Sequence, residues 1–204
     1  MSLSPKISAG TAIAKTPSKK ANRTLGLLRR TLGPCHKDVK AKAYETLVRP
    51  QLEYASEAWN PTSKTQVDQL EKIQRAAARF VHRDYRRTTS VTPLVTNLGW
   101  DTLHTRRLLN QSTMFFKIHY NHVNINFPPL VVPATLITRK DHRLKYQLPS
   151  TSTEAFRLSF YPRSIRVWNL LPPNAVCAPS VEAFRKVALP AIRVMLPPSG
   201  TSLL

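Results

Sequence analysis

The sequence predicts a mainly α fold, with a helical bundle-like N-terminal part followed by a small α+β part that contains one β-hairpin. Apolar residues recur at the three- and four-residue spacing of helices, and Ser, Gly and Pro stand at the ends of these segments as start and stop signals. One late segment, Leu144–Leu148, alternates apolar and polar residues as a strand does, and Ala155–Phe160 is its possible partner. Together these patterns predict helices with a single hairpin.

The N-terminal part divides into an arm and a helical domain. Residues 1–19 are rich in Ser, Thr, Lys and Pro, which predicts a disordered basic arm. Residues 20–127 are expected to form the helical domain, in which Pro50 ends or kinks the second helix. The predicted helices of this domain are Lys20–Leu32, Lys37–Arg49, Leu52–Trp59, Ser63–Arg87, Val91–Leu98 and Thr102–Tyr120.

The C-terminal part is expected to be smaller and mixed. Residues 128–189 follow a proline-rich loop and are predicted to hold the hairpin, a helix at Arg163–Leu171 and a last helix from the Ser180 cap to Leu189. Residues 190–204 are predicted to form a flexible tail. No apolar run reaches the length of a bilayer span, so we expect no membrane partner. The two distant cysteines, Cys35 and Cys177, suggest no disulfide framework and an intracellular location, nuclear or cytoplasmic.

The predicted helix Ser63–Arg87 separates apolar from basic residues. Its apolar sector holds Val67, Leu70, Ile73, Ala77, Phe80 and Val81. Its basic sector holds Lys72, Arg75, Arg79, Arg83 and, if the helix continues, Arg86. Cations about one turn apart suit a polyanion, because each neutralised phosphate releases counterions. A solvated charged face is the other interpretation, since most amphipathic helices have one.

The sign of the charge favours a polyanion. The chain carries a formal net charge of +20, and such an excess attracts nucleic acid or anionic membranes. Between Lys72 and Arg107 the only acidic residues are Asp84 and Asp101. An ordinary solvated face mixes charges of both signs.

Catalytic motifs are missing from the sequence. Five glycines are too few and too scattered for a phosphate-binding loop, and neither a Gly-Lys-Ser/Thr string nor a Gly-x-Ser-x-Gly elbow occurs. Two-metal phosphoryl transfer needs carboxylates that converge on a pair of cations, whereas the aspartates here are scattered along the sequence and each fits a cap, a helix face or a loop. His119 and His122 have the spacing for a shared metal but no third ligand nearby. We therefore predict no catalytic residues, no metal and no cofactor.

Many short strings, in one order, resemble a known family. They are Lys20–Leu32, Ala43-Tyr44, Leu47–Ser56 with Trp59 and Pro61, Leu70–Phe80, Leu98-Gly-Trp100, Arg106-Arg107, Ser159-Phe-Tyr-Pro-Arg163, Trp168-Asn-Leu-Leu-Pro172 and Ser180–Phe184. Over about residues 20–189 the chain resembles the region that follows the polymerase palm in reverse transcriptases of animal non-LTR retrotransposons. In that family the metal-binding aspartates lie in the palm, and their aromatic-Ala-Asp-Asp type motif is absent here.

The resemblance implies a non-catalytic, thumb-like fragment that grips RNA or DNA. The basic residues on the matching strings are Arg29, Arg30, Lys72, Arg75, Arg79, Arg106 and Arg107; the helix pattern adds Arg83, Arg86 and Arg87. Base stacking by Trp59, Trp100 or Trp168 is a weaker expectation than core packing, as it is for Tyr44 and Tyr54. Two alternatives stay open: a module that docks on a polymerase palm in another chain or on itself, and a decayed transposon remnant without a selected role.

Overall fold

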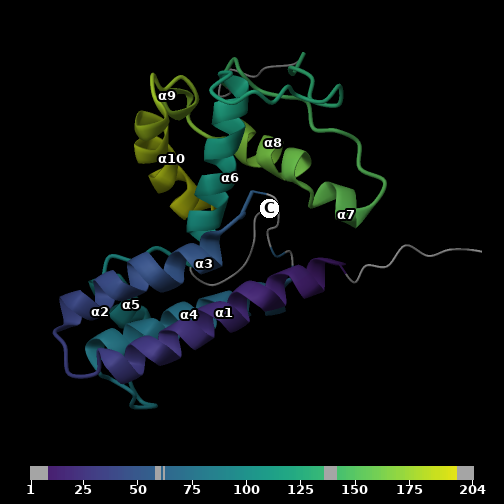
Figure 1. The fold of residues 1–204 in the computed structure, drawn as a ribbon. Coiled ribbons are helices and arrows are strands. Elements are labelled where there is room, and N and C mark those ends of the chain that lie inside the picture. Colours follow the sequence, from purple (N-terminus) through teal and green to yellow (C-terminus); the bar gives the residue numbers. More distant parts are fainter. Residues whose placement is uncertain (1–8, 58–60, 62, 136–141, 197–204) are drawn as a thin grey trace, which may run out of the picture. The chain divides into compact units, whose positions relative to one another are not determined.

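The computed structural model describes residues 9–57, 61, 63–135 and 142–196, with the side chains of residues 9–16 left out (Figure 1). It divides into two compact units, Met1–Arg106 (unit 1) and Arg107–Leu204 (unit 2). The division falls within α6 (Leu103–His119), and not near residue 128 as predicted. The reason is packing: Phe127 lies 5.2 Å from the ring of Phe115, so the end of the predicted N-terminal domain belongs to the core of unit 2.

In the described residues of unit 1, every regular element is a helix. Its elements are α1 (Ala9–Thr31), α2 (Lys37–Ala43), the π-helix η1 (Tyr44–Val48), α3 (Arg49–Glu53), α4 (Lys64–His82), α5 (Val91–Asn97) and the start of α6. Helix α1 packs against α3 and α4, and α2 packs against α4. The core between them is formed by Ala21, Leu25, Leu28, Tyr44, Val48, Leu52, Leu70, Ile73, Ala77, Ala78, Phe80, Val81, Trp100 and Leu103.

The first helix starts earlier than predicted. Helix α1 begins at Ala9 and continues through Pro17, so the disordered arm was wrong for residues 9–19. Alanine has the strongest helix propensity, and Ala9, Ala12 and Ala14 all lie in this first stretch. Residues 1–8 of the predicted arm lie outside the described residues.

Pro50 changes the helix type without ending the helix. The N–H of Arg49 donates to the carbonyl of Tyr44, five residues back, and this wider turn accommodates a proline that has no N–H and needs space against the preceding turn. The wider turn also changes which side chains face inward. Tyr44 is buried as predicted, and Val48 is buried with it, but Leu47 is 51% exposed.

The predicted helix Leu52–Trp59 does not form. Helix α3 ends at Glu53, and Ala55 has a positive φ of 50°, which is incompatible with a continuing helix. Tyr54 is 75% exposed, so its predicted burial was wrong. Trp59 lies outside the described residues.

Helix α4 confirms the predicted start but not the predicted end. The Ser63 hydroxyl accepts a hydrogen bond from the N–H of Gln66 at 3.3 Å, as an N-cap does. The helix stops at His82 because Arg83 adopts a left-handed conformation with φ 55°. Arg86 is therefore not on the helix.

Unit 2 is built around aromatic side chains. It contains the rest of α6 with α7 (Glu154–Arg157), α8 (Phe160–Leu170), α9 (Pro173–Val176) and α10 (Val181–Met195). The rings of Phe116 and Phe184 stack at 4.5 Å, and Phe115 lies 5.1 Å from Trp168. Helix α10 continues through Pro190 to Met195, so the predicted tail was wrong for residues 190–195.

The predicted hairpin was wrong. Residues 155–157 belong to α7, which Thr153 caps, and Phe160 starts α8, so the second strand does not form. Within the described residues there is no strand, only an antiparallel bridge between Pro133 and Tyr146. The side chain of Asn169 takes the place of a neighbouring strand: its Oδ1 accepts from Tyr146 N at 3.0 Å and its Nδ2 donates to Tyr146 O at 2.7 Å.

Candidate nucleic-acid interface

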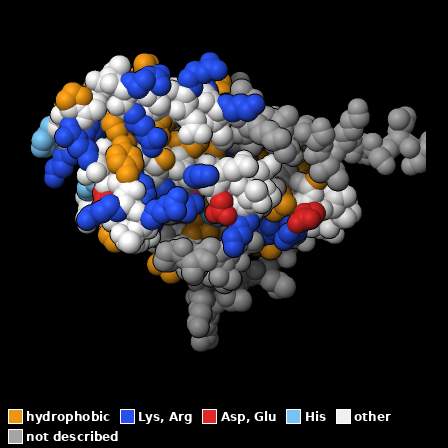
Figure 2. Space-filling model, turned by 90° about the horizontal axis from the view of Figure 1, so that it is seen from below, with side chains coloured by type: hydrophobic (Ala, Val, Ile, Leu, Met, Phe, Trp, Pro, Cys, Tyr) orange, Lys and Arg blue, Asp and Glu red, His pale blue; other side chains and the backbone are white. Residues whose placement is uncertain are grey.

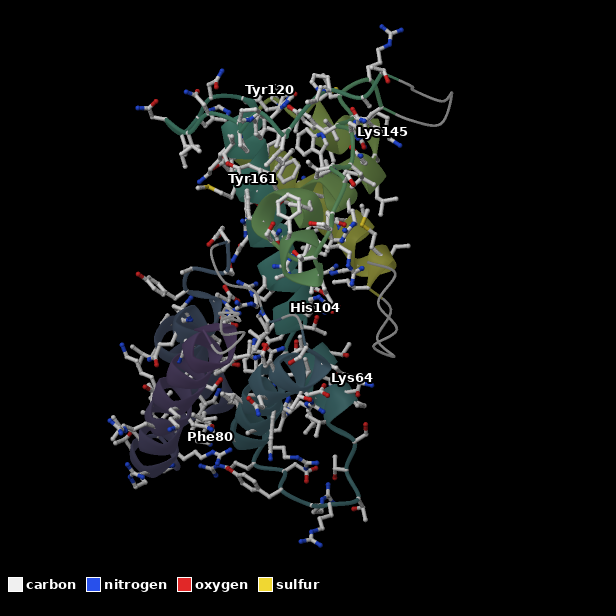
Figure 3. All side chains as sticks on the ribbon, turned by 90° about the vertical axis from the view of Figure 1, so that its right-hand side faces the viewer. Lys64, Phe80, His104, Tyr120, Lys145 and Tyr161 are labelled. Carbon is white, nitrogen blue, oxygen red and sulfur yellow. The ribbon has the colours of Figure 1, made fainter. Side chains whose placement is uncertain are left out.

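Helix α4 buries its apolar sector and exposes most of its basic sector. Leu70, Ile73, Ala77, Phe80 and Val81 are buried, whereas Lys72, Arg75 and Arg83 are exposed. The labels Lys64 and Phe80 mark the first residue and the last turn of α4 in Figure 3. The amphipathic pattern predicted from the sequence is confirmed for this helix.

Helix α1 adds a cation to the basic side of α4. Arg29 is exposed, and its Nη2 donates to the carbonyl of Ala76 at 3.0 Å. Ala76 lies four residues after Lys72, which is the spacing of one helix face. Arg83 in turn donates from Nη2 to the carbonyl of Gly33, just past the end of α1. We call Arg29, Lys72, Arg75 and Arg83 the α1–α4 basic surface.

Arg79 has a structural role within unit 1. Its guanidinium donates to the carbonyls of Asp84, Arg86 and Thr89 at 3.2, 2.8 and 3.0 Å. The side chain is half-buried and ties the segment after α4 to the end of the helix. Most of its donors are occupied inside the protein, so it is left out of the α1–α4 basic surface.

Three other predicted residues are exposed and lie outside helix α4. Arg86 forms a hydrogen-bonded ion pair with Asp84 at 2.9 Å, and the bond from Arg86 holds the pKa of Asp84 well below its usual range. Arg87 follows Arg86 in the segment after the helix. Arg30 lies next to Arg29 on α1, about 100° further around the helix.

The adjacent residues Arg106 and Arg107 are not part of the α1–α4 basic surface. Arg106 is half-buried in unit 1 and forms two hydrogen bonds to the carboxylate of Glu53, one of them at 3.1 Å. Arg107, in unit 2, is 1% exposed. A guanidinium this deeply buried has no surface to offer a phosphate. The predicted binding roles of both residues therefore find no support in their positions.

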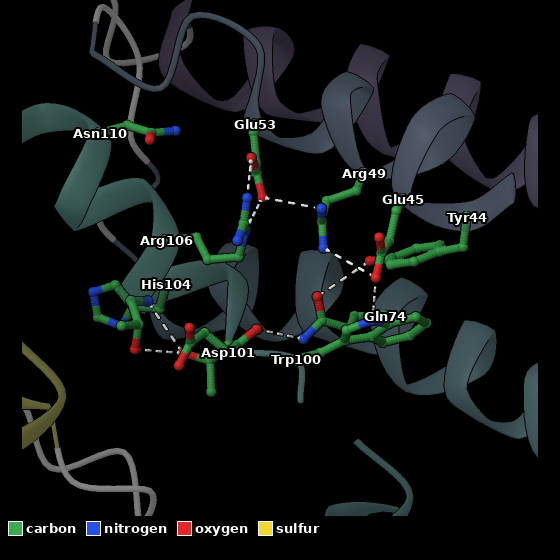
Figure 4. A network of polar contacts seen from close by, with 12 residues as sticks. Tyr44, Glu45, Arg49, Glu53, Gln74, Trp100, Asp101, His104, Arg106 and Asn110 are labelled. Atoms are coloured by element: carbon green, nitrogen blue, oxygen red, sulfur yellow. Dashed lines mark hydrogen bonds and ion pairs between the residues drawn. The ribbon is translucent and has the colours of Figure 1, made fainter. Parts of the chain in front are cut away.

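Three carboxylates of unit 1, those of Glu45, Glu53 and Glu71, face inward and bind protein groups, and Figure 4 shows this polar network. Glu45 accepts a hydrogen bond from Trp100 Nε1 at 2.8 Å, Glu53 binds Arg106, and Glu71 accepts from the N–H of His104 at 3.0 Å. Burial raises the pKa of Glu71, and the backbone N–H groups of His104 and Leu103 and the charge of Arg75 act against this rise. These carboxylates hold α2, η1, α3 and α4 to the start of α6, so they leave the exposed cations largely uncompensated.

Unit 1 carries a large excess of positive charge. Its sequence holds 19 Lys and Arg residues against 8 Asp and Glu residues. On the face drawn in Figure 2, the charged side chains are mostly Lys and Arg. One acidic residue, Asp68, is exposed on α4 one turn before Lys72. The surface of unit 1 therefore attracts polyanions over a broad area.

Two of the tryptophans and one of the histidines that the sequence offered as binding residues pack inside the protein or against its core. Trp100 and Trp168 are 8% and 1% exposed, which confirms core packing for both. His119 is half-buried, and its Nδ1 lies 2.6 Å from the hydroxyl of Tyr146, a residue of the core of unit 2. In the described part of the chain no three metal-ligating side chains cluster. None of the helices described there is both long and apolar enough to cross a bilayer.

No protein-family model, no curated protein and no solved structure matches this chain.

Proposed function

We propose that unit 1 binds the phosphate backbone of RNA or DNA through the α1–α4 basic surface, with little preference for base sequence. The observation that carries this proposal is the meeting of Arg29, Lys72, Arg75 and Arg83 from two helices, while Glu45, Glu53 and Glu71 are engaged inside the unit. Arginine and lysine contacts to phosphates supply affinity and register without reading bases.

We further propose that the chain is a non-catalytic relative of the post-palm region of non-LTR retrotransposon reverse transcriptases. The ordered series of short strings between residues 20 and 189 supports this origin. Gripping a nucleic-acid strand is the role that such an origin implies.

The test is binding of the full chain to labelled single-stranded and duplex nucleic acid over a range of salt concentrations. The double variant Lys72→Glu/Arg75→Glu should weaken binding at least about tenfold and flatten the plot of log affinity against log salt by about 2 units, since each phosphate contact contributes about 0.9. The matched control is Lys186→Glu/Arg193→Glu, which changes the charge equally at two exposed positions of α10.

Two outcomes contradict the proposal. One is an affinity that does not change with ionic strength. The other is an equal loss of affinity in the α10 control, which would mean that net charge alone attracts the nucleic acid.

Two variants of Arg83 separate the effect of its charge on nucleic-acid binding from its effect on the stability of the fold. A left-handed backbone costs glycine nothing and costs alanine about 1 kcal/mol, so Arg83→Gly should unfold less readily than Arg83→Ala. Both variants lose the same positive charge and the same hydrogen bond to Gly33. Equal losses of affinity in the two variants would therefore assign the effect to the cation. Unequal losses that follow stability would assign it to the fold.

A second candidate function is docking on another protein, favoured by exposed apolar side chains of unit 1. Leu27 and Leu47 are each 51% exposed, on α1 and η1, two elements that pack together. Large exposed apolar groups that lie close together mark interaction surfaces. Size-exclusion chromatography with light scattering, with and without nucleic acid, separates the two functions, since docking predicts self-association or complex formation that added salt does not abolish.

A further inference from the structure

Three arginines lie near one another where α7 meets α8 in unit 2. Arg157 is the last residue of α7, and Arg163 and Arg166 are three residues apart on α8. The opposite side of α8 is buried, with Ile165 and Trp168 at 0% and 1% exposure. The two α8 arginines therefore lie together on the side away from the core, close to the end of α7.

The Arg163 guanidinium is left with an unused donor. Its Nε is buried and has no hydrogen-bond partner within the described residues. Buried donors are almost always satisfied, by protein, water or a ligand. An unpaired Nε in the middle of an arginine cluster points to a ligand that accepts hydrogen bonds.

The positive charges of these arginines also repel one another. Burial and, to a smaller extent, the charge of Arg166 together lower the pKa of Arg163 to about 10. Burial likewise lowers the pKa of Arg166, with a contribution from Arg157. For both α8 arginines the neighbouring charges are thus positive, and they act in the same direction as burial.

Few carboxylates are available to neutralise these arginines. Unit 2 has 12 Lys and Arg residues against 3 Asp and Glu residues in its sequence. Glu154 pairs with Arg157 at 3.3 Å, and Glu182 lies in the first turn of α10. The third, Asp141, lies outside the described residues.

Helix α8 is held firmly at the end that carries Arg163. The amide Nε2 of Gln111 on α6 donates to the Phe160 carbonyl at 3.2 Å and to the Ser164 hydroxyl at 3.0 Å. Two arginines on a fixed helix lose less freedom when they bind a ligand than arginines on a loop would.

We propose that Arg157, Arg163 and Arg166 form a binding site for a phosphate group on unit 2, distinct from the α1–α4 basic surface. A phosphate supplies several acceptor oxygens for guanidinium donors, and its negative charge removes the repulsion within the cluster. The phosphate belongs either to a nucleic-acid strand or to a small phosphorylated molecule, and both share this chemistry.

The test is NMR of the full chain with ¹⁵N-labelled arginine, titrated first with inorganic phosphate and then with a short oligothymidylate. The Nε–Hε signal of Arg163 should shift and saturate with inorganic phosphate, but not with chloride at equal ionic strength. A much higher affinity for the oligonucleotide would identify a strand as the source, whereas similar affinities would identify a small phosphorylated molecule.

Variants at the cluster complete the test. Arg166→Gln should weaken phosphate binding at least about tenfold, the loss expected for one charge-assisted hydrogen bond. Lys186→Gln, which removes one exposed charge from α10, is the matched control and should bind as the wild type does. Arg163→Met should also lose binding but should resist unfolding at least as well as the wild type, because it removes a buried, repelled charge.

The proposal is overturned if phosphate produces no saturable shift of the Arg163 signal, or if Lys186→Gln weakens binding as much as Arg166→Gln. Lys72→Glu/Arg75→Glu should leave this site intact. Failure of the α1–α4 basic surface and failure of the phosphate site are therefore separate outcomes.

Discussion

The two units are both basic and helical, but they are stabilised in different ways. In unit 1, Glu45, Glu53 and Glu71 tie helices together through hydrogen bonds to Trp100, Arg106 and a backbone N–H. In unit 2, rings do this work, with Phe115, Phe116, Trp168 and Phe184 packed at centroid distances between 4.5 and 6.4 Å.

The difference shows how a chain with few acids can place its cations. Unit 1 uses Glu45, Glu53 and Glu71 internally and leaves the cations of the α1–α4 basic surface exposed. Unit 2 uses few charges in its core and leaves three arginines on α7 and α8 that repel one another. In each unit the exposed positive charge follows from what holds the core together.

The largest effect is expected in the aromatic core of unit 2. Trp168→Ala should lower the free energy of unfolding by about 3–5 kcal/mol, because it leaves a large cavity and removes the hydrogen bond from Nε1 to the Leu144 carbonyl at 2.7 Å. Denaturant unfolding of the full chain measures this loss. Leu170→Ala, on the same helix but 57% exposed, is the control and should change stability by less than about 0.5 kcal/mol. Equal effects of the two variants would refute the ring-based core.

A smaller effect should come from the internal ion pair of unit 1. Arg106→Met should lower the free energy of unfolding by about 1–3 kcal/mol, because Glu53 loses its closest hydrogen-bonded partner. Nucleic-acid affinity should fall no more than in the α10 control. Lys72→Met should do the reverse, with little loss of stability and a clear loss of affinity. If Arg106→Met weakened binding as strongly as Lys72→Met, Arg106 would belong to the interface.

The pH dependence of stability distinguishes the units further. Burial and the nearby His142 lower the pKa of His119 below its ordinary value of 6.5. As the pH falls below this value, the unfolded chain binds a proton that the folded chain does not, so the free energy of unfolding should decrease. His119→Gln should remove this part of the acid sensitivity, as measured by denaturant unfolding at about pH 7 and about pH 5. An unchanged pH dependence in this variant would contradict the assignment.

The smallest effect is expected from Asp68, an exposed acid next to the α1–α4 basic surface. Asp68 lies one turn before Lys72 and is exposed. Asp68→Asn should tighten nucleic-acid binding by about twofold, since it removes a repulsion of the size seen for exposed charge pairs. Competition binding at low salt detects such a change. Weaker binding would place the nucleic acid elsewhere.

Local patterns allowed most helices to be predicted from the sequence. The Ser63 cap, the buried side of α4 and the helix that starts near Thr102 are set by residues close in sequence. The prediction of a hairpin was wrong because an alternation of only five residues is outweighed by tertiary contacts. Here the Asn169 amide bonds to the backbone of Tyr146, where a second strand would otherwise pair. The predicted end of α4 was wrong because the left-handed position that ends the helix is taken by an arginine, whereas glycine is the usual signal in a sequence.

The candidate interface could be predicted only in part, because residue type does not reveal a side chain's partner. Arg79 and Arg83 look alike in the helical pattern, yet Arg79 binds three carbonyls of the next segment. Arg29 contacts α4 through a tertiary contact 47 residues away in sequence. The α8 cluster did leave a signal, in the two arginines three residues apart after Pro162 with no acid between them.

The pairing of Asn169 with Tyr146 has a consequence for solubility. Backbone groups on both sides of Tyr146 are occupied: Lys145 and Gln147 bond to residues 134 and 132, and Tyr146 bonds to Asn169. An extended segment with an open edge invites a strand from another molecule, and this amide closes that edge within the described chain. Asn169→Ala would reopen it, so cross-β aggregation on storage should begin at this segment.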